Sequence, residues 1–323
     1  MYWRRRLALL IAIAGFAALA VALLRDGGAV RPEGQAAARP APLPTAGPAP
    51  LGSTGTAPAP LAVRLDQQPD PLLLEFRRPP RAGLLFDLDT GRVLWRRNAS
   101  HVLPIASLTK MMTALLVAER VPRRGRVRIT PETLRYRGSG VGLLPRGKLI
   151  RAQTMLHGLL LPSGNDAAIA LAQRAAGGSL RRFVALMNRR AAAMGLKCTR
   201  FASPSGLDDG DISCAGDLAA LARAVLRTPR IARIVRRRSA VLPFPIRGGK
   251  LYLYNTNPLL RARYRGTTGL KTGYTYAAGR CLVATVRRGR TGLGVVLLRS
   301  RDPATQARRL LDRGFRFART VAG

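Results

Sequence analysis

Residues 106–119 read ASLTKMMTALLVAE, and this stretch decides how the rest of the chain is interpreted. Apolar residues occupy nearly every side of a helix drawn through it, which predicts a helix buried in the core. Pro104 lies just ahead, where a helix can begin but not continue, so Ser107 falls in the first turn. Lys110 follows one turn later on the same face. The sequence therefore predicts a hydroxyl and an amine side by side in a low-dielectric interior.

This pair of side chains has two interpretations. Burial can lower the pKa of a lysine by roughly 3–5 units. A neutral Lys110 can then take the proton of Ser107, while the N-terminus of the helix favours the negative charge that develops on the oxygen. The alternative is a capping serine and a lysine whose ammonium group reaches water. The spacing alone favours the second interpretation, so the rest of the chain must decide.

The composition is strongly basic. The 323 residues include 55 Lys and Arg against 16 Asp and Glu, a formal net charge of +39. Such a balance indicates an anionic partner, for example a membrane surface, an acidic wall polymer or nucleic acid. Aromatic residues are 5% of the chain and are not interleaved with the basic runs, so we expect no nucleic-acid partner.

Lysine is rare among the basic residues. Because arginine does not lose its proton in a protein, a base or tunable cation must be lysine. The lysines are Lys110, Lys148, Lys197, Lys250 and Lys271.

The cysteines and histidines exclude two classes of site. Three cysteines and two histidines occur, and none of them has CxxC or HExxH spacing, so we expect no metal and no cofactor. The small number of histidines and the absence of a GxSxG motif disfavour a Ser-His-Asp enzyme.

The N-terminus predicts export. Residues 1–6 read MYWRRR, and residues 7–24 are uninterrupted apolar or glycine sequence. That length lies between a long signal-peptide core and a minimal membrane span. The arginines place the N-terminus inside and everything after Arg25 outside. We therefore expect residues 1–25 to be a signal peptide or an N-terminal membrane anchor.

The remaining chain divides into a linker and a folded domain. Residues 26–71 are rich in Pro, Ala and Gly, which is typical of a disordered or polyproline-like linker. Residues 72–323 begin with a predicted β-hairpin around Asp89-Thr90-Gly91. Strands before and after a helical middle predict an α+β domain with a mostly antiparallel sheet built from both ends of the chain. The expected helices are 153–161, 166–176, 180–194, 215–226 and 304–317, and the expected later strands are 250–254, 268–274, 280–287 and 293–299.

Two further motifs follow residues 106–119. Ser163-Gly164-Asn165 lies in a turn between two helices, and Lys271-Thr272-Gly273 lies on a β-like run. Taken singly, the first is an ordinary helix break and the second a strand edge with a bulge-forming glycine. As an ordered set they are uncommon. Ser107 is also the only serine in the chain with a lysine three residues later.

The ordered set resembles the motifs of the serine penicillin-binding proteins and serine β-lactamases. The flanking sequences ASLTKMMTAL, LLPSGNDAA, PSGL and GLKTGYT are similar to those of the low-molecular-mass D-alanyl-D-alanine carboxypeptidases. The resemblance covers about residues 84–317. It implies a β-lactamase/transpeptidase-like fold, with a mostly antiparallel sheet flanked by helices and an all-helical lobe.

The resemblance also implies three catalytic residues. Ser107 would attack the carbonyl of the penultimate D-Ala, release the terminal D-Ala and carry the acyl group. Lys110 would be the general base, and Ser163 would relay a proton toward the leaving amine. The backbone N–H of Ser107 would form half of an oxyanion hole. The substrate would be a peptidoglycan stem peptide ending in D-Ala-D-Ala, and β-lactam antibiotics would be covalent inhibitors.

The same resemblance implies substrate-binding residues. Asn165 would contact the substrate amide and the catalytic lysine. Lys271 and Thr272 would bind the terminal carboxylate, which suits a cation beside a hydroxyl. Gly273 completes this motif, and the backbone N–H of Tyr274 would form the second half of the oxyanion hole. Some relatives have histidine at the position of Tyr274, which affects the expected pH dependence.

An arginine pair, the N-terminal apolar segment and two cysteines are further features of this chain. Family members carry an arginine near the end of the last strand that helps to bind the carboxylate, and both Arg299 and Arg301 are candidates. Many relatives have a C-terminal anchor, which residues 7–24 would replace here. The protein would then act at the outer face of the bacterial cell membrane, or in the cell wall if it is secreted. In an exported protein, Cys198 and Cys214 are candidates for a disulfide.

Three alternatives stay open. A β-lactamase of class A needs a glutamate for deacylation, and none of the glutamates follows Glu132, so a long-lived penicilloyl adduct is expected. An endopeptidase or transpeptidase would share the acylation step and differ in the molecule that takes the acyl group. A basic, non-catalytic wall-binding protein would retain the motifs without using them.

Overall fold

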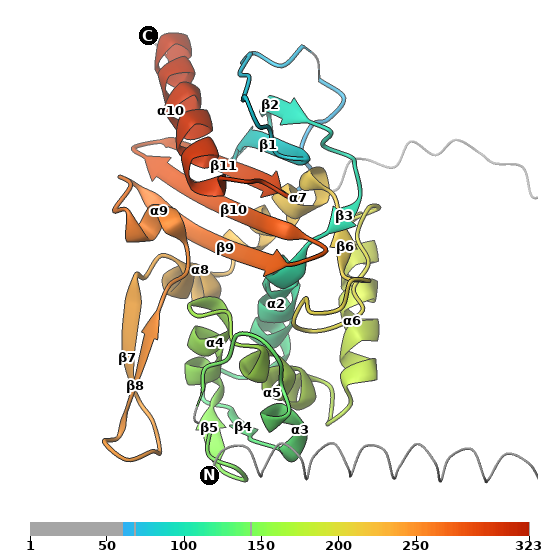
Figure 1. Ribbon diagram of the computed structural model, residues 1–323, viewed down its shortest axis with the longest axis vertical. Coiled ribbons are helices and arrows are strands. Elements are labelled where there is room, and N and C mark those ends of the chain that lie inside the picture. The colour runs from blue at the N-terminus through green and yellow to red at the C-terminus, as the bar shows by residue number, and fades with distance from the viewer. Residues whose placement is uncertain (1–60, 68, 143, 323) are drawn as a thin grey trace, which may run out of the picture. The chain divides into compact units, whose positions relative to one another are not determined.

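The computed structural model describes residues 61–67, 69–142 and 144–322 (Figure 1). The expected signal peptide or anchor at 1–25, and the linker up to residue 60, lie outside this part of the chain. Among the residues described, no helix is both long and apolar enough to cross a membrane.

A five-stranded sheet is the centre of the fold, with strand order β2-β1-β11-β10-β9. All neighbouring strands pair antiparallel. The N-terminal hairpin supplies two strands and the C-terminal third of the chain supplies three, which confirms the α+β prediction. The bounds are β1 Ala82–Asp87, β2 Val93–Arg97, β9 Thr267–Thr275, β10 Gly279–Arg288 and β11 Thr291–Leu298.

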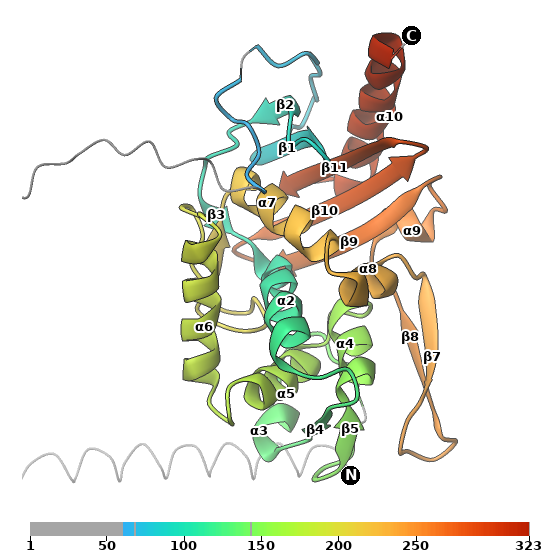
Figure 2. The same cartoon turned by 180° about the vertical axis from the view of Figure 1, so that it is seen from behind.

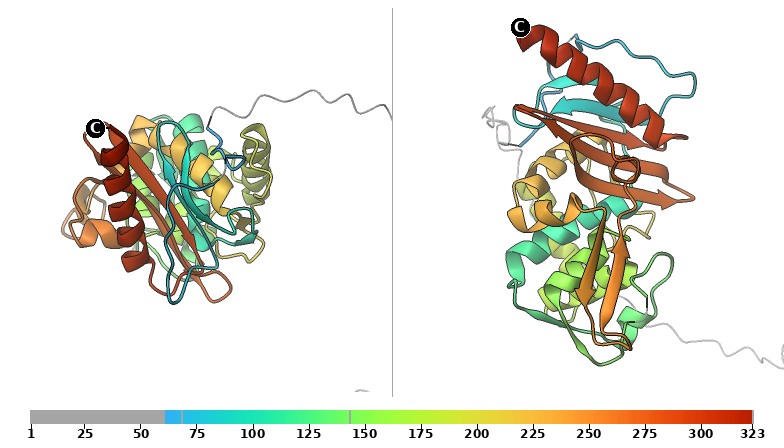
Figure 3. Two further views of the ribbon diagram at one scale, coloured as in Figure 1. Left: turned by 90° about the horizontal axis from the view of Figure 1, so that it is seen from above. Right: turned by 90° about the vertical axis from the view of Figure 1, so that its left-hand side faces the viewer.

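Helices cover both faces of this sheet (Figures 1 and 2). Because successive side chains on a strand point to opposite faces, each strand contributes to two cores. Leu85 and Val295 pack with the C-terminal helix α10 (Pro303–Ala322), whereas Leu84 and Val296 join the larger core of the helical lobe. Figure 3 shows α10 on one side of the sheet and the helices of the helical lobe on the opposite side.

The helical lobe surrounds α2 (Lys110–Arg120), which packs against α4, α5, α6, α7 and α8. Residues 110–117 are all buried, as the apolar pattern predicts. The other helices are η1 Ala106–Thr109, α3 Pro131–Leu134, α4 Ala152–Leu160, α5 Asn165–Ala175, α6 Leu180–Ala193, α7 Ala215–Leu226, α8 Pro229–Val235 and α9 Pro258–Arg261.

Three two-stranded pairs lie outside the main sheet. The sequence predicted β8 but left its partner β7 unassigned, a short strand that ends at Pro243. The β7–β8 hairpin buries Ala240 and Leu253 on one face and exposes Tyr252 on the other. The pairs are β3 Leu103–Pro104 with β6 Ile212–Ser213, β4 Arg126–Arg128 with β5 Leu149–Arg151, and β7 Ser239–Pro243 with β8 Lys250–Tyr254.

Contacts to the folded domain begin before residue 72, the boundary expected from composition. The Arg223 guanidinium donates hydrogen bonds to the carbonyl oxygens of Leu61 and Ala62, at 2.7 and 2.8 Å. Arg96 Nη1 donates to the carbonyl oxygen of Leu65 at 2.6 Å. Buried Arg223 and half-buried Arg96 thus hold residues 61–65 against the folded domain, although composition assigned these residues to the linker.

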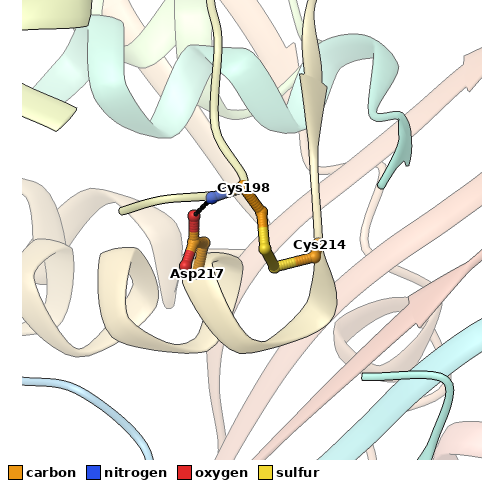
Figure 4. A group of neighbouring side chains, drawn as sticks. All are labelled: Cys198, Cys214 and Asp217. Carbon is orange, nitrogen blue, oxygen red and sulfur yellow. Dashed lines mark hydrogen bonds between the residues drawn. A yellow bond between two sulfur atoms is a disulfide. The ribbon is translucent and has the colours of Figure 1, made fainter. Parts of the chain in front are cut away.

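The candidate disulfide between Cys198 and Cys214 is present (Figure 4). It closes a loop between α6 and α7. Asp217 Oδ2 accepts a hydrogen bond from the Cys198 N–H at 2.7 Å, which anchors the same end of the loop. The three side chains also lie close enough to hold a metal ion, but the two sulfur atoms are bonded to each other.

Candidate active site

Ser107 lies in the short 3-10 helix η1, one turn before α2, rather than in the first turn of an α-helix. Ala106 has φ of +49°, a left-handed conformation that costs a non-glycine residue energy and is found at functional sites. The neighbouring strand β9 runs close to this turn. A Cβ at Gly273 would lie 2.9 Å from the Ile105 carbonyl oxygen and 3.1 Å from the Ser107 nitrogen. Only glycine therefore lets β9 approach the serine so closely.

Lys110 is fully buried beside Ser107. Its Nζ lies 2.8 Å from Ser107 Oγ, 2.6 Å from Asn165 Oδ1 and 2.6 Å from the Ser205 carbonyl oxygen. A neutral amine fits this environment, because it can donate to the two carbonyl-type oxygens and accept from the hydroxyl. Burial, followed by the nearby charge of Lys271, holds the pKa of Lys110 well below its usual value.

Lys271 is also buried, on β9. Burial lowers the pKa of its ammonium group to about 7. Its Nζ donates a hydrogen bond to the carbonyl oxygen of Thr272 at 2.8 Å. Two lysines that face the same interior thus both have lowered pKa values, which is typical of functional sites.

The second motif reaches the same place from the helical lobe. Asn165 begins α5, and its Nδ2 donates to the Arg137 carbonyl oxygen at 2.6 Å while its Oδ1 accepts from Lys110. Ser163 has φ of +68°. Its Oγ is buried and has no hydrogen-bond partner among the described residues. An unsatisfied buried hydroxyl is costly, so Ser163 Oγ has hydrogen-bonding capacity that the described residues do not use.

The third motif lines the edge of the sheet. Thr272 Oγ1 lies 2.7 Å from Thr256 Oγ1. Tyr274 is 59% exposed, and its backbone belongs to the end of β9. Of the two candidate arginines, Arg299 packs against Gly279 at the start of β10, whereas the Arg301 carbonyl oxygen accepts from Arg280.

The loop of residues 204–207 completes the site. Its sequence is similar to that of the family, but no role was predicted for it. The Ser205 carbonyl accepts from Lys110, and Gly206, with φ of +81°, packs against the backbone of Ala106 and Ser107. Asp211 is fully buried beneath this loop and accepts hydrogen bonds from Ala202 N, Ser203 N and Ser203 Oγ. Nothing in the run Asp208-Asp209-Gly210-Asp211 distinguishes the buried carboxylate from its exposed neighbours.

Comparisons with known proteins agree with this arrangement. A family model described as D-alanyl-D-alanine carboxypeptidase matches residues 79–301. The D-alanyl-D-alanine carboxypeptidase DacF of Bacillus subtilis is 34% identical over 250 residues, which are 75% of this chain and 63% of that protein. The D-alanyl-D-alanine endopeptidase of Pseudomonas aeruginosa is 34% identical over 258 residues, 73% of this chain and 82% of that one.

The likeness extends to solved structures. A point mutant of the Streptomyces K15 DD-transpeptidase matches with a TM-score of 0.69 and 28% identity, over 75% of this chain and 99% of that one. The matched region is thus nearly the whole of a solved relative, although it is less than two thirds of the length of the Bacillus protein. The chain belongs to the D-alanyl-D-alanine carboxypeptidase family.

Proposed function

We propose that this protein is a serine-type D-Ala-D-Ala carboxypeptidase that trims peptidoglycan stem pentapeptides through an acyl-enzyme at Ser107. The observation that carries the proposal is the 2.8 Å approach of a buried Lys110 amine to Ser107 Oγ. Family membership supports the same activity. The substrate class follows from the family, and β-lactam antibiotics follow as covalent inhibitors.

Acylation begins with proton transfer from Ser107 Oγ to the neutral Lys110 amine. The oxygen attacks the carbonyl carbon of the penultimate D-Ala, and the N–H groups of Ser107 and Tyr274 stabilise the oxyanion. Ser163 Oγ then gives its proton to the leaving amine and takes the proton held by Lys110, the peptide bond breaks, and D-Ala departs. Water takes the acyl group in the second half of the reaction and restores the serine.

The terminal carboxylate of the substrate is the feature that selects a C-terminal peptide. Lys271 supplies a cation, and Thr272 supplies a hydroxyl beside it. Arg299 is the stronger candidate for a second cation, because it packs against Gly279, which pairs with Thr275 next to Tyr274.

The placement of the enzyme is also part of the proposal. Residues 1–25 export or anchor the chain, residues 26–71 act largely as a linker, and the serine peptidase domain follows. Residues 7–24 would contact the cytoplasmic membrane if they are retained, and the domain would act outside it, in the cell wall.

The test is release of D-alanine by the purified full-length protein from a pentapeptide ending in D-Ala-D-Ala, compared with cleavage of a cross-linked peptide dimer. We expect release from the pentapeptide and loss of release in Ser107→Ala. Faster cleavage of the dimer would instead identify an endopeptidase, the activity named for the Pseudomonas relative. D-alanine release that persists in Ser107→Ala would contradict the mechanism.

A further inference from the structure

Arginines line two adjoining hollows at the C-terminal end of α2. The first hollow, of about 700 Å³, lies beside the β4–β5 pair. The second, of about 350 Å³, continues toward α8 and shares Arg123 and Gln153 with the first. We call the two hollows together the arginine groove, and its cationic residues are Arg123, Arg124, Arg126, Arg151, Arg230, Arg233 and Arg237.

The positive charge of the arginine groove is not neutralised within the protein. Arg126 and Arg151 stand directly opposite each other in the β4–β5 register, and both are exposed. Like charges in this arrangement destabilise a strand pair. Within the described ranges, the carboxylates that form ion pairs do so with Arg96, Arg190 and Arg287, all outside the groove. The fold alone therefore gives no reason for this concentration of charge.

One guanidinium that lines the groove is held in a fixed position by two hydrogen bonds. Arg230 Nε donates to Gln153 Oε1 at 3.0 Å, and its Nη1 donates to the Val121 carbonyl oxygen at 2.5 Å. Its Nη2 is buried and has no hydrogen-bond partner in the part of the chain that the structure describes. Burial and the charge of Arg123 lower the pKa of Arg230 from its usual value. An anion in the groove would relieve this repulsion.

We propose that the arginine groove binds a phosphodiester chain that carries no bases, such as an anionic polymer of poly(glycerol phosphate) type. Guanidinium groups suit phosphate oxygens, because they donate paired hydrogen bonds and stay charged. Their spread over two connected hollows matches several phosphates in a row better than one ion. Within the residues described, neither hollow is lined by Phe, Tyr or Trp, so no platform for base stacking is present.

The shape and place of the groove support a polymer rather than a membrane. A concave surface encloses a chain, whereas a bilayer is met by protruding residues. The groove lies at the far end of α2 from Ser107, and the 11 residues of that helix span roughly 16 Å. Figures 1 and 2 show β4 and β5 at the end of the helical lobe opposite the five-stranded sheet. A bound chain would thus leave the serine accessible.

The test uses the full-length protein and four probes: poly(glycerol phosphate), single-stranded DNA, long-chain inorganic polyphosphate, and phosphatidylglycerol vesicles. The variant is Arg123→Gln/Arg126→Gln/Arg151→Gln. The matched control is Arg308→Gln/Arg313→Gln/Arg319→Gln, which removes three exposed charges from α10. Binding is followed as a function of salt, and labelling of Ser107 by a fluorescent penicillin checks that each variant is folded.

We expect poly(glycerol phosphate) to bind the native protein and the control variant. The groove variant should bind it about tenfold or more weakly, and its slope of log K against log salt should fall by about 2, one phosphate contact per arginine. Equal loss in the control variant would overturn the proposal, because net charge alone would then explain binding. Binding to vesicles without binding to the polymer, or a clear preference for DNA, would overturn it as well.

Discussion

The two ends of α2 use positive charge in opposite ways. At the N-terminal end, Lys110 and Lys271 are buried, and both have lowered pKa values. At the C-terminal end, Arg123, Arg126 and Arg151 are exposed and stay charged. A lysine can lose its proton at an accessible pH and an arginine cannot. The comparison separates two buried lysines, whose pKa values burial lowers, from exposed arginines, which keep their charge.

Removing the titratable amine should have the largest effect. Lys110→Arg places a permanent positive charge where the neutral amine lies and cannot accept the proton of Ser107, so we expect acylation by penicillin to slow by about 10³-fold or more. Stopped labelling reactions with a fluorescent penicillin measure the rate. Lys148→Arg, at an exposed position, is the control and should leave the rate unchanged. A Lys110→Arg enzyme within tenfold of native would show that this end of α2 needs only charge.

Removing the disulfide near the N-terminal end of α2 should have the next largest effect. The Cys198–Cys214 bond spans 16 residues and anchors the loop whose Ser205 carbonyl holds Lys110. We expect Cys198→Ser/Cys214→Ser to lower the free energy of unfolding by about 3 kcal/mol, measured in urea. The buried Cys281 is the control: Cys281→Ala should change acylation little. An unchanged free energy of unfolding in the double variant would show that the disulfide does not stabilise this loop.

The pH dependence of kcat/KM tests the role of Lys271 in the native protein. Burial lowers the pKa of Lys271 to about 7, and in the proposed mechanism its protonated form binds the substrate carboxylate. Because kcat/KM reports the free enzyme, it should fall as pH rises above about 7, by about tenfold per unit. Lys271→Arg stays protonated, so this fall should move to much higher pH in that variant. A native profile that is flat from pH 7 to 9 would contradict the role of Lys271.

The smallest expected effect is a change in KM that distinguishes Arg299 from Arg301, the two arginines that follow β11. Arg299→Leu should raise KM for the D-Ala-D-Ala peptide several-fold to about tenfold, the scale of one exposed charge-assisted contact. Arg301→Leu is the matched control and should leave KM near the native value. Steady-state kinetics decide between them. A larger effect for Arg301 would reverse the assignment made from the packing of Arg299 against Gly279.

Much of the fold follows from pattern. The run of apolar residues after Lys110 predicts the buried α2, and alternating residues at both ends of the chain predict one antiparallel sheet, as observed. These patterns predict structure well because each buried position is recorded by its own apolar residue. The order of the three motifs likewise predicts that Ser107, Asn165 and Lys271 belong to one site, and Lys110 contacts the first two directly.

Other features depend on contacts between distant residues. The 3-10 turn at Ser107 is set by the close approach of Gly206 and Gly273, which no local pattern records. The role of the Ser205 carbonyl could not be predicted either, because every residue has a backbone carbonyl and only the fold selects one. The arginine groove shows the same limit: the composition indicates an anionic partner, whereas only the register of β4 and β5 places Arg126 opposite Arg151.

The most direct test of the central claim is the site of covalent modification by benzylpenicillin. The intact native protein should gain one penicilloyl group, which peptide mapping by mass spectrometry should place on Ser107. The adduct should be long-lived, because no glutamate follows Glu132 in the chain to assist class A deacylation. An adduct that persists in Ser107→Ala, or rapid turnover of the penicillin by the native protein, would contradict the account.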